Sequence, residues 1–224
     1  ESIAAVLLPI SSTELFEAGP KFIRREKVAV APTSTSGEVL RAFGGQDYLW
    51  RTTESDIAQL ETMLLIALQR GHKSVGMLTN FEPYGATFFD WFGFLASELS
   101  LEITGVERYD DTTEPGWCHS FLDQLLGNKP DTLIVVANNL DEVECVARSV
   151  EESGEDTQLL FSETAFNGEL IDRMGSSANG LEVVTPAPAP ESGFEIAYRY
   201  EFGVDPPPYA ANLYDAVLLL GYGL

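Results

Sequence analysis

The sequence predicts an α/β protein whose parallel sheets are covered by helices on both faces. Short apolar strands alternate with helical segments along the whole chain, which is the pattern of parallel strands joined by helical crossovers. Residues 132–137 (Thr-Leu-Ile-Val-Val-Ala) are apolar on both faces, as expected of a central parallel strand. Several strands end in clusters of hydroxyl residues, which predicts a polar ligand-binding rim at the carboxyl edge of a sheet.

Local signals place each element in chain order. Thr53 is the expected N-cap of one helix, Pro83 begins another where proline is tolerated, and Gly71 and Gly154 end helices. The expected strands are residues 3–8, 28–31, 74–79, 101–107, 132–137, 158–161 and 181–185, with a short extended piece at 48–50. The expected helices are residues 12–25, 53–70, 83–99, 115–126, 140–153, 169–174, 192–202 and 209–223.

Two segments interrupt the alternation and predict two lobes. Residues 44–51 and the proline-rich residues 186–190 are interpreted as crossovers between the lobes, because short extended linkers with proline make defined hinges. The first lobe is then discontinuous, residues 1–50 and 187–224, and the second is residues 51–186. With only two strands, the first lobe would be thin for a sheet core.

The charge of the chain excludes several classes of partner. It carries 35 acidic and 13 basic residues, for a net charge of −22. A field of this sign repels phosphate backbones and anionic lipid, so neither nucleic acid nor a membrane surface is an expected partner. No apolar run reaches the ~18 residues that cross a bilayer. The scattered acids favour a solvated surface over a cation-binding patch.

The sequence contains no motif typical of an enzyme active site or of a zinc site. The chain has no GxSxG, P-loop or GxGxxG sequence, so we expect neither an enzyme nor a cofactor. Its two cysteines, Cys118 and Cys145, lack the ligand set of a zinc site. We favour free buried thiols for this pair, with a disulfide between adjacent helices as the alternative.

Several motifs together resemble the type I periplasmic binding proteins, in the branched-chain amino acid receptor group that serves ABC importers. They fall in the order and near the spacing of that family over essentially the whole chain. The matching runs are Ala5-Val6-Leu7-Leu8 before Ser11-Ser12, residues 30–35 (Val-Ala-Pro-Thr-Ser-Thr), residues 50–59 (Trp-Arg-Thr-Thr-Glu-Ser-Asp-Ile-Ala-Gln), Tyr84-Gly85, residues 129–134 (Lys-Pro-Asp-Thr-Leu-Ile) and residues 209–216 (Tyr-Ala-Ala-Asn-Leu-Tyr-Asp-Ala).

The resemblance implies a two-lobed receptor that closes on a small ligand and passes it to ABC permease subunits. An amino acid or a similar zwitterion is the expected ligand. The expected location is periplasmic or extracellular, and a lipid anchor on a preceding segment is compatible with it. The resemblance also implies that the chain is an internal part of a longer receptor whose first lobe is incomplete here.

The first lobe contributes hydroxyl residues to the expected site. The resemblance places Ser12, Ser34 and Thr35 near a ligand carboxylate, and Ser11 and Thr33 belong to the same two clusters. Because Ser11-Ser12 stand where a helix begins, free backbone N–H groups and hydroxyls would point at one spot and favour an anion. The structural alternative is that Ser12 is only an N-cap.

The second lobe contributes an acid and an aromatic residue. Glu163 matches the family position that receives the ligand ammonium, and the alternative is an ordinary exposed loop acid. Tyr84 matches the aromatic residue that packs on the ligand and can donate its hydroxyl, and the alternative is a core tyrosine. Asn138 would hydrogen-bond the ligand and Phe81 would add an apolar wall. Arg51 and Asp56 are interpreted as structural.

Two other functions stay open from the sequence. One is a sensory ligand-binding domain on the same fold. The other is a binding protein for a ligand without the zwitterion, such as an aromatic acid or an amide.

Overall fold

A computed structural model describes residues 3–110, 112–114 and 116–223 and divides into two compact units. The first unit comprises Glu1–Asp56 with Pro186–Leu224, and the second comprises Ile57–Thr185. The lobe boundaries that the sequence predicts, at residues 50 and 186, stay a prediction. In the described part of the chain, every helix is too short or too polar to span a bilayer.

A parallel three-stranded sheet forms the centre of the first unit, with strand order β1-β2-β3. Helices α1 and α2 pack on it through a small core of Leu15, Ala31 and Val39. The unit contains strands β1 (Ala5–Leu7), β2 (Val28–Val30) and β3 (Leu49–Trp50), helices α1 (Ser12–Ile23), α2 (Gly37–Phe43), α8 (Phe194–Phe202) and α9 (Ala210–Gly223), and the 3₁₀ turn η3 (Pro190–Ser192).

A parallel five-stranded sheet, of order β5-β4-β6-β7-β8, forms the centre of the second unit. The strands are β4 (Ser74–Asn80), β5 (Glu102–Tyr109), β6 (Thr132–Val135), β7 (Gln158–Phe161) and β8 (Glu182–Val183). The helices are α3 (Asp56–Gln69), α4 (Pro83–Glu98), α5 (Trp117–Gly127), α6 (Leu140–Ser153) and α7 (Gly168–Met174), with 3₁₀ turns η1 (Glu163–Ala165) and η2 (Gly175–Ala178). This architecture confirms the predicted α/β class with parallel sheets.

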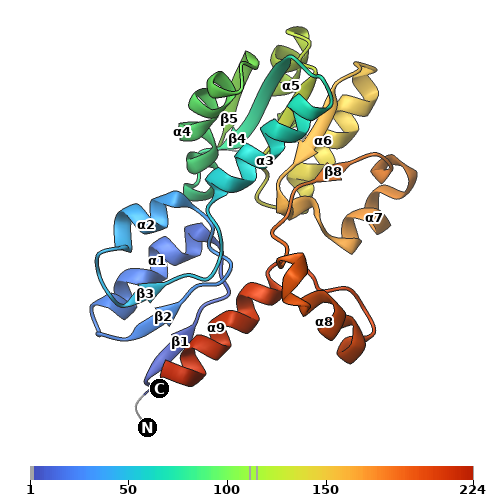
Figure 1. The fold of residues 1–224 in the computed structure, drawn as a ribbon. Helices are drawn as coiled ribbons and strands as arrows, with labels where there is room; N and C mark the ends of the chain where they lie inside the picture. Colours follow the sequence, from blue (N-terminus) through green and yellow to red (C-terminus); the bar gives the residue numbers. More distant parts are fainter. Residues whose placement is uncertain (1–2, 111, 115, 224) are drawn as a thin grey trace. The chain divides into compact units, whose positions relative to one another are not determined.

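Two cores, one on each face, hold the second sheet between helices (Figure 1). Because side chains alternate along a strand, Leu133 and Val135 face α5 and α6, whereas Ile134 and Val136 face α3 and α4. Leu160 also packs on the α3 and α4 side. Burial on both faces explains why the strands read as continuous apolar runs in the sequence.

Most predicted elements are confirmed within a few residues. Gly71 and Gly154 follow α3 and α6 with left-handed φ values of 82° and 67°, as predicted for helix-ending glycines. The expected start of α5 at Pro115 lies outside the described residues. Gly85 is required by close packing, since a Cβ there would lie 2.6 Å from the carbonyl oxygen of Asn80.

The structure differs from the predicted elements at three places. Helix α2 is missing from the predicted elements, although Val39 and Phe43 have helical spacing after the N-cap Ser36. Residues 44–51 contain β3, which pairs with β2 and gives this sheet a third strand where the sequence predicted only a short extended piece; their role as a crossover between lobes stays a prediction. Helix α3 begins at Asp56 and not after Thr53.

Thr52 lies in the extended segment before α3 and bonds to α9. Its hydroxyl donates to the carbonyl oxygen of Asn212 at 2.7 Å, and its own carbonyl accepts from the Asn212 side-chain amide at 2.7 Å. This pair of bonds ties the segment before α3 to the first turn of α9.

The two cysteines form a disulfide, so the preferred interpretation as free thiols is wrong. Cys118 lies in the first turn of α5 and Cys145 lies on α6, and their Cα atoms are 6.3 Å apart. The two helices pack side by side on one face of the sheet, and Cys118 is fully buried there. Spacing along the sequence could not show that the two side chains face each other.

We expect reduction of this disulfide to destabilise the second unit by about 3–4 kcal/mol, because the bond closes a loop between residues 27 apart. The measurement is urea unfolding with and without dithiothreitol. A double variant, Cys118→Ala with Cys145→Ala, is the control and should not respond to the reductant. Equal unfolding free energies before and after complete reduction would contradict the prediction.

Candidate functional site

The strand ends of the second sheet bring two predicted site residues into direct contact. Tyr84, in the first turn of α4 after β4, donates its hydroxyl to Oε2 of Glu163 at 2.6 Å. Glu163 follows β7 in the turn η1. Tyr84 is almost buried and its ring meets Phe88 edge-on, with centroids 5.4 Å apart. The tyrosine is therefore both a packed core residue and a hydrogen-bond donor at the sheet edge.

Gln59 is a third member of this cluster that the sequence analysis did not single out. From the first turns of α3, its Nε2 donates to Oε2 of Glu163 at 2.8 Å and to the carbonyl oxygen of Val184 at 2.6 Å. The signal was present, because Gln59 closes the motif run at residues 50–59. Two neutral donors from two helices thus orient one carboxylate.

Ser162, beside Glu163, was also not predicted as a site residue. Its side chain is fully buried, and its Oγ has no hydrogen-bond partner among the described residues. A buried hydroxyl without a partner has a desolvation cost of about 1–3 kcal/mol. Its place directly after β7 puts this polar group at the same sheet edge as Glu163.

Asn138 joins a different network, which is built around the buried acid Glu142. Its main-chain N–H donates to Oε2 of Glu142 at 2.6 Å, and its side-chain oxygen accepts from Nδ2 of Asn80 at 3.2 Å. Tyr109 donates its hydroxyl to the same Oε2 at 2.6 Å, and Asn139 caps α6 by accepting from the N–H of Glu142. These bonds tie together the ends of β4, β5 and β6.

The ring of Phe81 stacks with the guanidinium of Arg108. The Arg108 guanidinium lies 4.1 Å from the Phe81 ring centroid and 4.4 Å from that of Phe89. Phe81 remains more than half exposed. Its predicted role as an apolar wall for a ligand stays a prediction.

The first unit gathers its predicted hydroxyl residues around the ends of β1 and β2. Thr33 and Ser34 both donate their hydroxyls to the carbonyl oxygen of Ile10, at 2.9 Å and 2.7 Å. Ser12 is buried, and its Oγ accepts from the N–H of Ser36 at 3.1 Å. These bonds join the two loops.

Ser11 and Thr35 have different surroundings from these three residues. Ser11 is the exposed N-cap of α1 and forms a capping box with Glu14, whose carboxylate accepts from its N–H at 2.8 Å. These hydrogen bonds lower the pKa of Glu14. Thr35 is buried, and its carbonyl oxygen accepts from the N–H of Asp56 at 3.2 Å. The helix-capping alternative raised for Ser12 therefore applies to Ser11.

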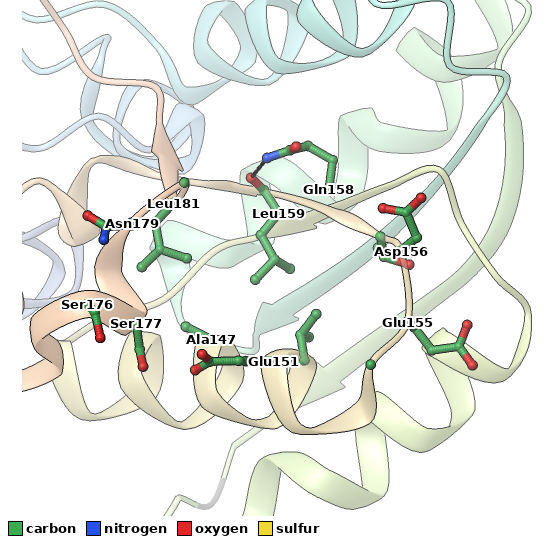
Figure 2. A pocket seen from close by; sticks show the side chains of 14 residues that line it. Ala147, Glu151, Glu155, Asp156, Gln158, Leu159, Ser176, Ser177, Asn179 and Leu181 are labelled. Carbon is green, nitrogen blue, oxygen red and sulfur yellow. Dashed lines mark hydrogen bonds between the residues drawn. The ribbon is translucent and has the colours of Figure 1, made fainter.

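Two hollows are also present, one in each unit. A hollow of about 830 Å³ in the first unit lies beside α8 and α9, with Phe194, Tyr198 and Phe202 in its lining. A hollow of about 410 Å³ lies at the amino end of β7, between α6 and η2 (Figure 2). Glu151, Glu155 and Asp156 line the second one, but no group of three or more such residues among those described could hold a metal ion.

The Glu142 network predicts a pH-dependent stability. Burial raises the pKa of Glu142, and its hydrogen bonds to Tyr109, Asn138 and Asn139 offset this only in part. Because the folded state then holds the proton more tightly than the unfolded state, the contribution of Glu142 to stability is largest below pH 4.5 and falls as pH rises through the raised pKa.

We therefore expect the unfolding free energy of the native chain, relative to Glu142→Gln, to decrease as pH rises above 4.5. The decrease should be about 1.4 kcal/mol per unit of pKa shift. Urea unfolding of both proteins between acidic and neutral pH measures it, and Glu151→Gln on the same helix corrects for net charge. A difference that grows with pH would contradict the prediction.

Solved structures of solute-binding proteins share this fold. A leucine binding protein from Thermotoga maritima matches with a TM-score of 0.79 and 21% identity, over 97% of this chain and 63% of its own. An ABC transporter substrate-binding protein from Desulfitobacterium hafniense, solved in complex with Leu, matches with a TM-score of 0.75 and 23% identity, over 98% and 64%.

A third structure comes from Rhodopseudomonas palustris, a solute binding protein of an ABC transporter in complex with 3,4-dihydroxybenzoic acid. It matches with a TM-score of 0.72 and 18% identity, over 97% of this chain and 61% of its own. The chain thus spans less than two thirds of the length of each of these three structures. At these identities the likeness establishes the fold.

A comparison with curated proteins found no match. The model of one protein family, described as periplasmic binding protein, matches residues 1–224. This match and the shared fold confirm the resemblance seen in the sequence. The family is one of binding proteins and not of enzymes. The chain belongs to the periplasmic binding protein family.

Proposed function

We propose that this chain is the ligand-binding part of an ABC importer receptor that closes its two units on an amino acid or a similar small polar ligand. The observation that carries the proposal is the convergence of Tyr84 and Gln59 on the Glu163 carboxylate. The sequence motifs and the relatives solved with or named for leucine support the same ligand class.

Glu163 is suited to receive the ligand ammonium. The donors from Tyr84 and Gln59 are neutral, so they fix the orientation of the carboxylate without neutralising its charge. A ligand ammonium would form a charge-assisted hydrogen bond with this carboxylate, and such bonds are stronger than those between neutral groups. The site would thereby select against ligands that lack an amine.

The first unit is suited to receive the ligand carboxylate. The hydroxyls of Thr33 and Ser34 donate to Ile10, which leaves their oxygens as acceptors and makes main-chain N–H groups of this loop the better donors for an anion. Closure would then follow from ligand binding, because only a ligand that contacts both units favours the closed state over the open one.

The oxidised state of the cysteines supports the proposed location. Disulfides persist in oxidising compartments such as the periplasm and are rare in the cytosol. The Cys118–Cys145 bond is therefore in line with a periplasmic or extracellular receptor that delivers its ligand to permease subunits. Attachment through a lipid remains part of this proposal.

An acid without an ammonium is the second candidate ligand. The Rhodopseudomonas palustris structure holds 3,4-dihydroxybenzoic acid on the same fold. An aromatic acid would use the proposed carboxylate site of the first unit but would place no cation on Glu163.

We expect Glu163→Gln to weaken binding of an ammonium-bearing ligand about thirtyfold or more, because the variant keeps the shape of the side chain but loses the charge that pairs with the ligand. Tyr84→Phe should weaken it less, since it removes one neutral hydrogen bond. Calorimetric titration with a panel of amino acids, led by L-leucine, is the measurement.

Glu169→Gln, an exposed acid on the next helix, is the matched control and should leave affinity unchanged. Equal affinity of the native chain and Glu163→Gln would remove the ammonium assignment. Binding of 3,4-dihydroxybenzoate without any amino acid would favour the aromatic-acid alternative.

A further inference from the structure

Arg51 organises the loop that follows β2. Its Nη1 donates to the carbonyl oxygens of Thr35 at 2.8 Å and Ser36 at 2.9 Å, and the carbonyl oxygen of Ser34 lies 3.4 Å away. Three consecutive carbonyls thus converge on one guanidinium nitrogen. Arg51 follows β3 directly, and β3 pairs with β2, so a residue at the end of β3 holds the loop that follows β2.

The planarity of the peptide group decides where the N–H groups of this loop point. In a trans peptide, the carbonyl and the following N–H point in opposite directions. Carbonyls that face Arg51 therefore send the N–H groups of residues 35–37 toward the other side of the loop. The N–H of Ser36 confirms this direction, because it donates to Oγ of Ser12 at the start of α1.

The charge of Arg51 makes the surroundings of the N–H groups of residues 35–37 electrostatically positive. The guanidinium is half-buried, and burial lowers its pKa, while the charges of Asp56 and Glu54 oppose this change. Within the described residues its hydrogen bonds all go to neutral main-chain carbonyls. The Arg51 cation thus lies on the carbonyl side of the loop. Its charge and the peptide dipoles both make the electrostatic potential on the N–H side of the loop more positive.

We propose that Arg51 is the positioning residue of an anion-recognition loop at residues 33–36. Its charge, transmitted through the peptide groups of Ser34–Ser36, favours a carboxylate over a neutral group on the side of Ser12. This inference deepens the proposed function and rests on it for the identity of the ligand. It assigns to Arg51 a role in charge selectivity in addition to the structural role expected from the sequence.

The test compares L-leucine with L-leucinamide, which lacks the carboxylate charge, by calorimetric titration of native protein and Arg51→Met. We expect the affinity for L-leucine to fall about tenfold or more, because the loop loses both the cation whose field favours a negative charge and the bonds that orient its N–H groups. The affinity for L-leucinamide should fall much less, so that the preference for the carboxylate is lost. Equal losses for both ligands would overturn the proposal and leave a purely structural role.

Two variants make this result interpretable. Arg41→Met removes the same charge from α2, where Arg41 is exposed and paired with Glu38, and it should leave both affinities unchanged. Arg51→Lys keeps the charge without the forked donor geometry, and it should retain part of the preference for L-leucine. If Arg51→Met fails to fold, Arg51→Gln, which keeps donors but removes the charge, decides, and an unchanged preference for L-leucine in Arg51→Gln overturns the proposal.

A second measurement does not depend on the proposed ligand. Sodium acetate is titrated into ¹⁵N-labelled protein, with sodium chloride at equal ionic strength as the reference. We expect the amide signals of residues 35–37 to shift in the native chain and in Arg41→Met, and not in Arg51→Met. Failure of L-leucine to bind, together with these shifts, would count against the proposed ligand and in favour of the anion loop. Absence of the shifts in the native chain would overturn the loop itself.

Discussion

Parallel pairing of the strands is the constraint on which the rest of this structure depends. Each strand pair in both sheets is parallel within the described residues. Parallel neighbours need crossover helices, which cover the sheet, and they end at a common edge. Loops far apart in the sequence therefore meet at that edge, as residues 10–12 and 33–36 do in the first unit.

The strand ends of the two sheets carry different kinds of polar group. In the second unit, one carboxylate is held by neutral side chains from α3 and α4, so a fixed negative charge stands at the strand ends. In the first unit, the guanidinium of Arg51 donates to main-chain carbonyl oxygens of the loop at residues 34–36.

The fold was predictable from the sequence because both sheets are built from strong local signals. Strand β7 and helix α6 have the bounds that the sequence predicts, since apolar runs and the glycine after α6 mark them clearly. Short elements were less predictable. Helix α2 has seven residues and β3 has two, so both are too short to show a clear hydrophobic period in the sequence. Only pairing with β2 defines β3 as a strand.

The sequence by itself determined the fold class, the family motifs, and the hydroxyl and acidic residues at the strand ends, because these follow from residue type and short-range spacing. Tertiary structure decided which of those residues meet. The hydrogen bonds of Glu163 with Gln59 and Tyr84 join residues 104 and 79 positions apart, and the disulfide joins two helices. Such contacts depend on strand order and helix packing, and one strand or helix considered alone carries no information about either.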